Sequence, residues 1–266
     1  MSQRSTQIST QSGLLAGRVA VVTGASAGIG EAIVRSLCSF SAGCVINARR
    51  ADKLDQLARE LGTETVAPVV GDCCEDATIE RMLDVAKLGL HKGKSEADII
   101  IINAGRGLAG SVLTSDMSQW EEMVRTNLIG AAKLLRAAGN RMTASSTALA
   151  GPRDIVVLGS TVGRHISPFS SMYGSTKFAV NSLAEAARRE LGPKGIRVTL
   201  IEPGFVESEF QGVAGYKQDW FQEVKTRIGP VLTPADVART IAFIVQQPPH
   251  VHLSDVLIRP TRQDYP

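Results

Sequence analysis

Short apolar runs alternate with amphipathic stretches along most of this chain, and that alternation restricts the fold more than any other feature. The apolar runs are Val19–Val22, Cys44–Ile46, Val66–Val70, Ile99–Ile102, Ile155–Leu158, Val198–Ile201 and Val256–Ile258. Helical patterns lie between them, at Ile29–Phe40, Lys53–Leu61, Ala77–Leu90, Trp120–Thr143, Met172–Leu191 and Pro234–Gln246. Continuous apolar runs are typical of parallel strands buried on both faces. The alternation therefore predicts a doubly wound α/β fold, with about seven parallel strands and helices on both faces of the sheet.

The length of 266 residues, of which 44% are hydrophobic, is enough for one α/β domain. We predict a flexible tail at 1–14 and a single domain at 15–266. The tail has no apolar stretch for a secretory signal, although Arg4 without any acid still permits a short organellar transit peptide. Gly89–Ala97 is predicted as a surface loop. Residues 205–232 are rich in aromatic side chains, and we predict that they form a substrate lid.

Charge and cysteine content limit the partners of this chain. The formal net charge is +3, and no run of Lys or Arg is long enough to indicate a nucleic-acid groove or a membrane anchor. The four cysteines lack metal-ligand spacing, so no metal site is predicted, and two of them are adjacent, which does not suit structural disulfides. We therefore expect reduced thiols, a cytoplasmic location, and partners that are small molecules or other copies of the chain.

A glycine-rich turn follows the first apolar run, with the sequence Thr23-Gly24-Ala25-Ser26-Ala27-Gly28-Ile29-Gly30. Glycines let a backbone turn sharply and approach a pyrophosphate, and the N-terminus of the next helix attracts the phosphate charge. Three residues separate the first two glycines, which departs from the common dinucleotide-binding spacing. An ordinary strand-to-helix turn is the alternative, but the position after the first strand favours a phosphate site.

The second strand of such a fold ends where the cofactor ribose binds, and an acid there favours NAD whereas a base favours the 2′-phosphate of NADP. Here the strand ends in Asn47-Ala48-Arg49-Arg50, without an acid. Asp52 is better explained as a cap or dipole partner of the next helix. A solvated pair of arginines is the alternative interpretation. We predict that the cofactor is NADP(H).

Tyr173 and Lys177 are four residues apart in a helical pattern, so both side chains lie on one face of that helix. A tyrosine hydroxyl titrates near ~10 in water, and a nearby ammonium favours the ionised form. Such a pair can pass a proton to and from a substrate at neutral pH.

Together these motifs resemble the short-chain dehydrogenases/reductases of the classical type. The resemblance rests on the turn at Thr23–Gly30, Asn103-Ala104-Gly105, Asn127, Ser160, Tyr173-x-x-x-Lys177 and Pro203-Gly204, and it covers the chain from Leu15 to the last strand. It implies a Rossmann-like fold and an NADP(H)-dependent oxidoreductase that moves a hydride between the nicotinamide and a carbonyl or secondary alcohol of a small ketone, aldehyde, or β-hydroxy or β-keto acid.

The resemblance also implies roles for the matched residues. Tyr173 would be the general acid and base, Ser160 would orient the substrate oxygen, Lys177 would lower the tyrosine pKa and hold the ribose, and Asn127 would hold a water. Asn103 and Gly105 would flank the adenosine ribose, Asp72 would contact the adenine, and Pro203 to Val206 would border the nicotinamide. The full predicted cofactor set is Thr23, Gly24, Ser26, Gly28, Ile29, Gly30, Asn47, Arg49, Arg50, Asp72, Asn103, Ala104, Gly105, Tyr173, Lys177, Pro203, Gly204, Val206 and Ser208.

The substrate pocket is harder to predict than the chemistry. By position, the candidates are Arg106, Val162, Arg164, His165, Phe169, Met172, Phe205 and Phe210. The two arginines could bind a substrate carboxylate, or they could face solvent or another subunit. The resemblance further implies a homotetramer or a homodimer. Two alternatives to a reductase are a catalytically silent NADP(H)-binding sensor and an NADP-linked epimerase.

Overall fold

The computed structural model describes residues 13–90, 96–144 and 151–265. Residues 1–12 of the predicted tail and 91–95 of the predicted loop at Gly89–Ala97 lie outside the described residues. None of the helices described has both the length and the apolar character that a bilayer crossing requires.

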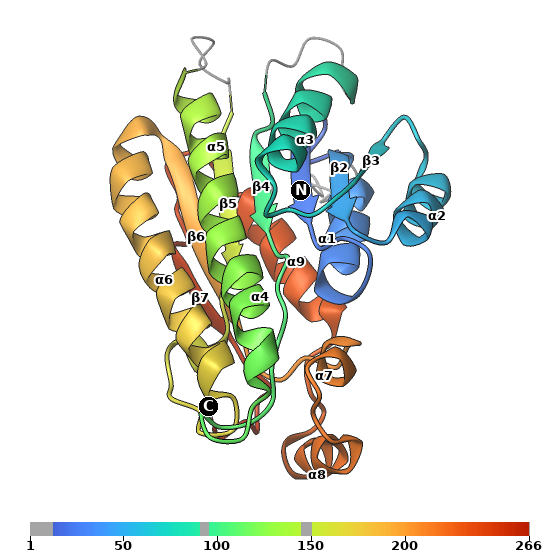
Figure 1. The fold of residues 1–266 in the computed structure, drawn as a ribbon. Coiled ribbons are helices and arrows are strands. Elements are labelled where there is room, and N and C mark those ends of the chain that lie inside the picture. Colours follow the sequence, from blue (N-terminus) through green and yellow to red (C-terminus); the bar gives the residue numbers. More distant parts are fainter. Residues whose placement is uncertain (1–12, 91–95, 145–150, 266) are drawn as a thin grey trace, which may run out of the picture.

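Seven parallel strands form one sheet, in the order β3-β2-β1-β4-β5-β6-β7 (Figure 1). Their bounds are β1 Val19–Thr23, β2 Gly43–Ala48, β3 Val66–Val70, β4 Ile99–Ile102, β5 Arg153–Leu158, β6 Ile196–Pro203 and β7 Asp255–Ile258. Each predicted apolar run lies within one of these strands, and the doubly wound α/β fold is confirmed.

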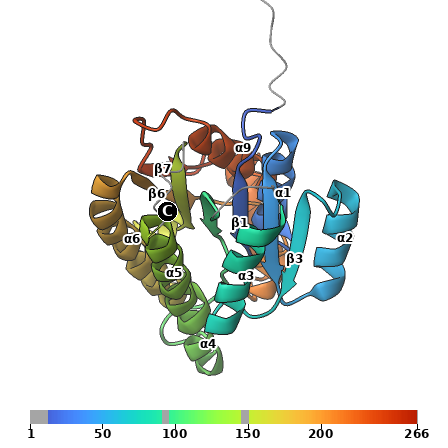
Figure 2. The same cartoon turned by 90° about the horizontal axis from the view of Figure 1, so that it is seen from above.

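Helices cover both faces of this sheet (Figure 2). On one face α3 (Asp76–Gly89), α5 (Ala131–Ala144) and α6 (Ser171–Leu191) share an apolar core with the sheet. On the other face α1 (Gly28–Ser39), α2 (Ala51–Leu61) and α9 (Pro234–Val245) share a second core. Side chains of β1 alternate between the two cores, Ala20 and Val22 facing one and Val19 and Val21 the other, which explains why its apolar run is continuous.

The predicted helix at Trp120–Thr143 is interrupted. It consists of α4 (Trp120–Val124), a π-helical turn at Arg125–Gly130, and α5. A π-turn adds one residue to the hydrogen-bonded ring but hardly changes the hydrophobic period, so the sequence pattern gave no sign of it. The turn contains Asn127, one of the predicted catalytic residues.

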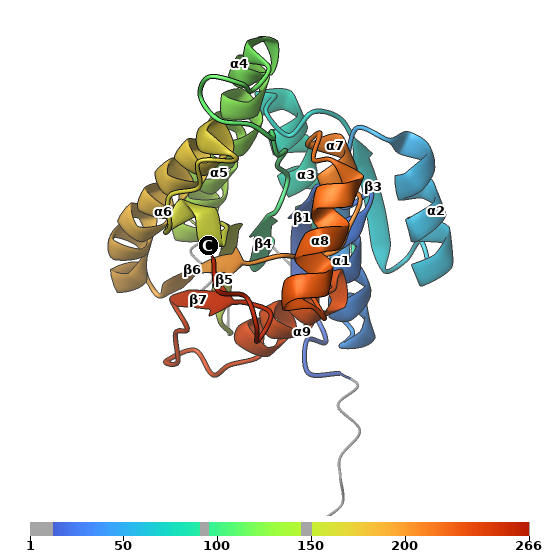
Figure 3. The ribbon, with the colours of Figure 1, turned by 90° about the horizontal axis from the view of Figure 1, so that it is seen from below.

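The sheet reverses its strand order between β1 and β4, which are neighbours. In open α/β sheets, ligands bind beyond the carboxyl ends of the strands at this kind of switch point. Residues 205–232 also leave the sheet at that edge, after β6, and contain α7 (Phe210–Val213) and α8 (Gln218–Ile228). Figure 3 shows both helices lying over this end of the molecule. The segment returns where it left, because Leu232 N–H donates to Phe205 O (2.9 Å) and Glu207 N–H donates to Leu232 O (2.8 Å).

A buried network of charges lies at the other end of the strands. The Asp154 carboxylate in β5 accepts hydrogen bonds from Arg18 Nη2 (2.8 Å) and from Arg197 Nε and Nη2 (2.8 and 2.9 Å). Arg18 also lies 3.5 Å from the Asp98 carboxylate. All four residues are buried. The network joins the starts of β1, β4, β5 and β6 in a place with little solvent.

Candidate active site

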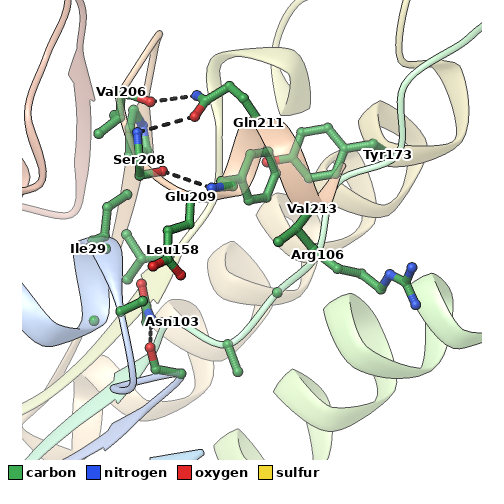
Figure 4. A pocket seen from close by; sticks show the side chains of 18 of the residues that line it. Ile29, Asn103, Arg106, Leu158, Tyr173, Val206, Ser208, Glu209, Gln211 and Val213 are labelled. Carbon is green, nitrogen blue, oxygen red and sulfur yellow. Dashed lines mark hydrogen bonds between the residues drawn. The ribbon is translucent and has the colours of Figure 1, made fainter. Parts of the chain in front are cut away.

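One cavity of about 640 Å³ lies at the carboxyl edge of the sheet and contains most of the predicted site (Figure 4). Nearly all of the predicted cofactor residues line it, namely Gly24, Ser26, Gly28, Ile29, Gly30, Asn47, Arg49, Arg50, Asp72, Asn103, Ala104, Gly105, Tyr173, Lys177, Pro203, Gly204, Val206 and Ser208. Thr23 is buried behind the lining. The cavity continues from the arginines after β2, past the glycine turn, to Tyr173 and the 205–232 segment.

The glycine turn is packed tightly against the end of β4. Thr23 Oγ1 accepts hydrogen bonds from the N–H groups of Asn103 and Ala104 (both 3.1 Å), and Asn103 Nδ2 donates to Thr23 O (2.9 Å). Gly24 has φ +68°, and a Cβ there would lie 2.8 Å from Asn103 Nδ2. A Cβ on Gly30 would overlap the carbonyl oxygen of Gly24. These two positions admit glycine only, so the turn brings bare backbone to the helix N-terminus.

Two arginines lie at the far end of the cavity, after β2. Arg50 donates to Ser26 Oγ (3.0 and 3.1 Å) and forms an ion pair with Glu209 (3.2 Å), which reaches across from the 205–232 segment. The Arg49 side chain is 75% exposed and lies 3.6 Å from the Glu122 carboxylate. Exposed pairs of this kind are weak, so both guanidinium groups can turn to a bound anion.

Two other residues in this region have structural partners. Asn47 Nδ2 donates to Val69 O (2.8 Å) and Gly71 O (3.2 Å), which ties β2 to β3. Burial alone would raise the pKa of Asp72, but hydrogen bonds from Cys74 N–H and Arg125 hold that pKa below its usual value. The Asp72 carboxylate and the thiols of Cys73 and Cys74 lie within 4.8 Å of one another. Because both carboxylate oxygens already accept hydrogen bonds, we propose no metal site there.

Tyr173 and Lys177 are buried side by side in the first turns of α6. Burial raises the pKa of the Tyr173 phenol above its ordinary value, and a hydrogen bond with Ser160 opposes that rise. Burial also lowers the pKa of Lys177 to about 8. Its Nζ donates to Leu158 O (2.6 Å) and lies 5.9 Å from the Tyr173 ring centroid. The expected lowering of the tyrosine pKa by Lys177 is therefore not found in this structure, where burial is the largest cause of the shift.

Asn127 holds the loop after β4 in place. From the π-turn, its Oδ1 accepts from Arg106 N–H (2.8 Å), while its Nδ2 donates to Arg106 O (2.9 Å) and to Thr176 Oγ1 (3.0 Å). Thr176 in turn donates to Tyr173 O (2.7 Å). The side chain thus links the loop after β4 to the helix that carries the tyrosine and lysine. Sequence reasoning gave no role to Thr176, since only the folded chain brings it to Asn127.

The predicted substrate residues are only partly brought together. Val162, Phe169, Phe205, Phe210 and Arg106 line the cavity. The side chains of Arg164, His165 and Met172 are not part of the lining.

Two arginines that were predicted to meet substrate are turned elsewhere. Arg164 pairs with the fully buried Glu202 (2.5 Å) and with Asp255 (2.6 Å). A buried carboxylate without a paired cation is costly, and this pairing keeps the Arg164 side chain out of the cavity. Arg106 donates to Gln119 Oε1 (2.5 Å), and its side chain leads away from Tyr173 (Figure 4).

The 205–232 segment builds one wall of the cavity. Ser208 Oγ accepts from Phe210 N–H (3.3 Å), and the Gln211 side chain bridges Ser208 N–H (3.2 Å) and Val206 O (2.6 Å) (Figure 4). These contacts turn the chain after β6 so that Phe210 lies against Tyr173, with ring centroids 5.6 Å apart. Lining residues in this wall that the sequence prediction missed are Glu209, Gln211, Val213, Tyr216, Trp220, Val224 and Arg227.

Three consecutive residues after β7, Gln263, Asp264 and Tyr265, also contact this wall, and we call them the strap. Gln263 Oε1 accepts from Phe205 N–H (3.0 Å), the Asp264 carboxylate accepts twice from Arg227 Nη1 (2.7 and 2.8 Å), and Tyr265 Oη donates to the carbonyl oxygen of Ile166. Tyr265 itself lines the cavity. No sequence motif predicts these contacts, because they depend on where the chain passes after β7.

Comparisons with known proteins agree with this geometry. The family model of the short chain dehydrogenases matches residues 18–219. The chain is 31% identical to a glycine betaine reductase of Emericella nidulans over 252 residues, which is 93% of this chain but only 19% of the length of that reductase. An oxidoreductase of Staphylococcus aureus is 28% identical, and the match covers 93% of this chain and 99% of that protein.

Solved structures give the same result. A serine dehydrogenase in a closed form with NADP+ superposes with a TM-score of 0.82 at 30% identity, covering 93% of this chain and 96% of that one. An alcohol dehydrogenase from the archaeon Thermococcus sibiricus, in complex with 5-hydroxy-NADP, has a TM-score of 0.78 at 25% identity, with coverages of 94% and 99%. The chain therefore belongs to the short chain dehydrogenase family and is an oxidoreductase of that type.

Proposed function

We propose that this protein is an NADP(H)-dependent oxidoreductase that transfers a hydride between the nicotinamide and the carbonyl or secondary alcohol of a small substrate, with Tyr173 as general acid and base. The observation that carries the proposal is the shared cavity: the glycine turn and the buried pair of Tyr173 and Lys177 line one space of about 640 Å³. The NADP+ bound to the related serine dehydrogenase supports the choice of cofactor.

The lining fits a dinucleotide. At the turn, glycines leave backbone N–H groups accessible at the start of α1, where an anion is favoured. A Cβ on Gly105 would lie 3.3 Å from Asn127 Oδ1 and 3.8 Å from Lys177 Nζ, so any larger residue would fill the space between the loop after β4 and the lysine. When bound there, the nicotinamide would supply the hydride donor or acceptor.

The proton chemistry belongs to the residues of this chain. Because its pKa is raised, Tyr173 is protonated at neutral pH and can donate a proton to a carbonyl oxygen during reduction. Ser160 would hold that oxygen by a hydrogen bond. With its pKa at about 8, Lys177 still carries most of its proton at neutral pH, and its positive charge would stabilise the tyrosinate left after donation. Its buried position, with walls of apolar side chains, strengthens that interaction.

Cofactor choice would depend on the end of β2. Arg49 and Arg50 are the lining residues directly after that strand, and no acid stands at its end to repel a phosphate. A 2′-phosphate would replace Glu209 as the partner of Arg50, so binding exchanges one weak ion pair for a charge-assisted bond. This predicts a preference for NADPH over NADH.

The test is a fluorescence titration with NADPH and NADH, followed by turnover of a panel of ketones and aldehydes. We expect NADPH to bind at least ~10-fold more tightly, which corresponds to ~1.4 kcal/mol. Arg50→Gln should remove most of that preference without affecting NADH, and Arg59→Gln, on the outer side of α2, is the matched control. Tyr173→Phe should keep NADPH binding and lose turnover. Equal affinity for both cofactors would refute the role of the arginines, and a fully active Tyr173→Phe would refute the mechanism.

Assembly and location remain proposals. Ile129, in the π-turn, and Phe178, in α6, are large apolar side chains exposed at the surface of this chain. We propose a homotetramer in the cytoplasm. Light scattering of the purified protein gives its mass, and a monomer at micromolar concentration would refute the assembly.

A further inference from the structure

Aromatic side chains gather at the substrate end of the cavity. Seven of the twelve Phe, Tyr and Trp residues of the chain line it. Besides Tyr173 they are Phe169, Phe205, Phe210, Tyr216, Trp220 and Tyr265. They come from three separate segments, which lie after β5, after β6 and after β7. Such a concentration gives this half of the cavity an apolar wall.

Most of these rings pack against one another. Trp220 stacks on Tyr216, with centroids 5.3 Å apart and planes 18° from parallel, and Phe205 packs at 55° to it with centroids 6.0 Å apart. A cation binds an aromatic ring through its face. Because Tyr216 covers one face of Trp220 and Phe205 packs against the same ring, this cluster offers apolar contact rather than an open cage for an ammonium group.

The cationic side chains at the substrate end of the cavity already interact with other groups of the protein. Arg227 donates to both carboxylate oxygens of Asp264. The Arg106 guanidinium donates to Gln119, although its Nε is buried without a partner among the described residues. Lys177 is buried and donates to Leu158 O. Within the described part of the chain, each of these lining cations therefore already has a protein partner, with which a substrate carboxylate would have to compete.

The mouth of this half exposes apolar surface to water. Phe169 and Val213, on opposite segments, are 62% and 67% exposed, although both line the cavity. Apolar surface gathered at a concave site marks a place where a ligand is bound. A ligand whose apolar group covered Phe169 and Val213 would bury its own apolar surface together with theirs.

We propose that the substrate end of the cavity selects carbonyl compounds whose remote part is uncharged and apolar, with a ring preferred to a smaller group. This rests on the proposed function, and it replaces the hydroxy-acid and keto-acid substrates that the sequence suggested. A remote carboxylate or ammonium would lose its hydration against the aromatic wall and would have to displace an existing protein partner to be paired, and this cost disfavours it. A ring would fill the wall, and in apolar pockets one methylene group alone changes kcat/KM by roughly 10 to 200-fold.

Matched substrates separate ring from charge. Butanone and benzylacetone share the reacting ketone and differ only by a remote ring, while 5-methyl-2-hexanone and levulinate have nearly the same shape and differ by one negative charge. Betaine aldehyde and tert-butylacetaldehyde have the same shape and differ by one positive charge. With NADPH, we expect kcat/KM to be at least about tenfold higher for benzylacetone, 5-methyl-2-hexanone and tert-butylacetaldehyde than for their partners. A preference for levulinate or for betaine aldehyde would overturn the proposal and leave the oxidoreductase intact.

Variants locate the selectivity. Trp220→Ala should reduce the benzylacetone to butanone ratio about tenfold, mainly through KM, and should leave NADPH affinity unchanged. Phe243→Ala, an exposed aromatic on α9 away from the cavity, is the control and should change nothing. Arg227→Gln should leave levulinate as poor a substrate as before, and a further fall for levulinate alone would show that this arginine does bind carboxylates.

A binding measurement keeps the proposal testable if no ketone is turned over. Trp120 and Trp220 are the two tryptophans of the chain, so Trp120→Phe makes Trp220 the single reporter. In a Trp120→Phe and Tyr173→Phe double variant loaded with NADPH, benzylacetone should quench the Trp220 emission at concentrations at least about tenfold lower than levulinate does. Equal or stronger quenching by levulinate would refute the apolar selectivity, whatever the outcome for catalysis.

Discussion

Replacing Asp154 with asparagine should strongly destabilise the fold while preserving its shape. The carboxylate is 1% exposed and accepts from two guanidinium groups, those of Arg18 and Arg197. Asparagine has nearly the same volume but no charge, so both arginines would remain buried with less compensation. Removing one partner of a buried ion pair typically costs about 3 to 5 kcal/mol.

The lower end of that range applies here. Arg197 Nη1 also donates to the backbone carbonyls of Gln247, Pro248 and Val251, and Arg18 Nη1 donates to Val245 O (2.6 Å). These acceptors stay in the variant and keep the guanidinium groups partly solvated. We therefore expect a loss of about 3 kcal/mol in the free energy of unfolding, which in a chain of this size lowers Tm by roughly 6 °C.

Urea unfolding followed by far-UV circular dichroism measures this loss, at one fixed protein concentration because association would couple stability to concentration. The control is Glu185→Gln, which removes a carboxylate from an exposed cluster with Arg188 and Arg189 and should hardly move the midpoint. An Asp154→Asn protein as stable as the wild type would show that backbone carbonyls alone satisfy the buried arginines, and the reasoning would fail.

Gly30→Ala should weaken NADPH binding at least about tenfold in a fluorescence titration, because the new Cβ overlaps the carbonyl oxygen of the first glycine of the turn, whereas Gly212→Ala, with open space around its Cβ, should not. The rate of carbonyl reduction should fall as the pH rises through about 8, where Lys177 loses its charge while Tyr173 keeps its proton, and Lys177→Arg should move that fall to higher pH. Arg164→Met should lower the free energy of unfolding by about 3 kcal/mol at neutral pH, because it leaves the buried Glu202 carboxylate without its cation. The loss should become smaller at low pH, where Glu202 is protonated.

The sheet could be predicted from the sequence because a strand that is buried on both faces consists of consecutive apolar residues. The central strands β1, β2, β4, β5 and β6 are buried along nearly their whole length. The edge strands β3 and β7 are only partly buried but also contain apolar runs, so all seven could be found without knowing their partners. The π-turn at Arg125–Gly130 could not be found in this way. It changes one hydrogen-bonding step in the backbone, and the side-chain pattern on either side still has the period of a helix.

The features of the candidate site that depend on local sequence were predictable, and those that depend on contacts between distant residues were not. The glycine turn depends on local backbone shape, and the pair Tyr173 and Lys177 depends on helical spacing, so both were predictable from short stretches of sequence. The orientation of Arg164 was not, because it depends on the buried Glu202, which is 38 residues away. Contacts of the strap with Arg227 likewise depend on the path of the chain after β7.

The strap has a consequence for how substrate preference could change over evolutionary time. Most of the predicted cofactor residues lie at the ends of strands or in the turns that follow them. The strap and the 205–232 segment contact each other through the side chains of Gln263 and Asp264, and neither is a strand of the sheet. Exchange of a few residues in these two segments would therefore give a new substrate pocket on an unchanged nucleotide-binding body, and descendants of one ancestral enzyme could diverge in substrate while their hydride chemistry stayed the same.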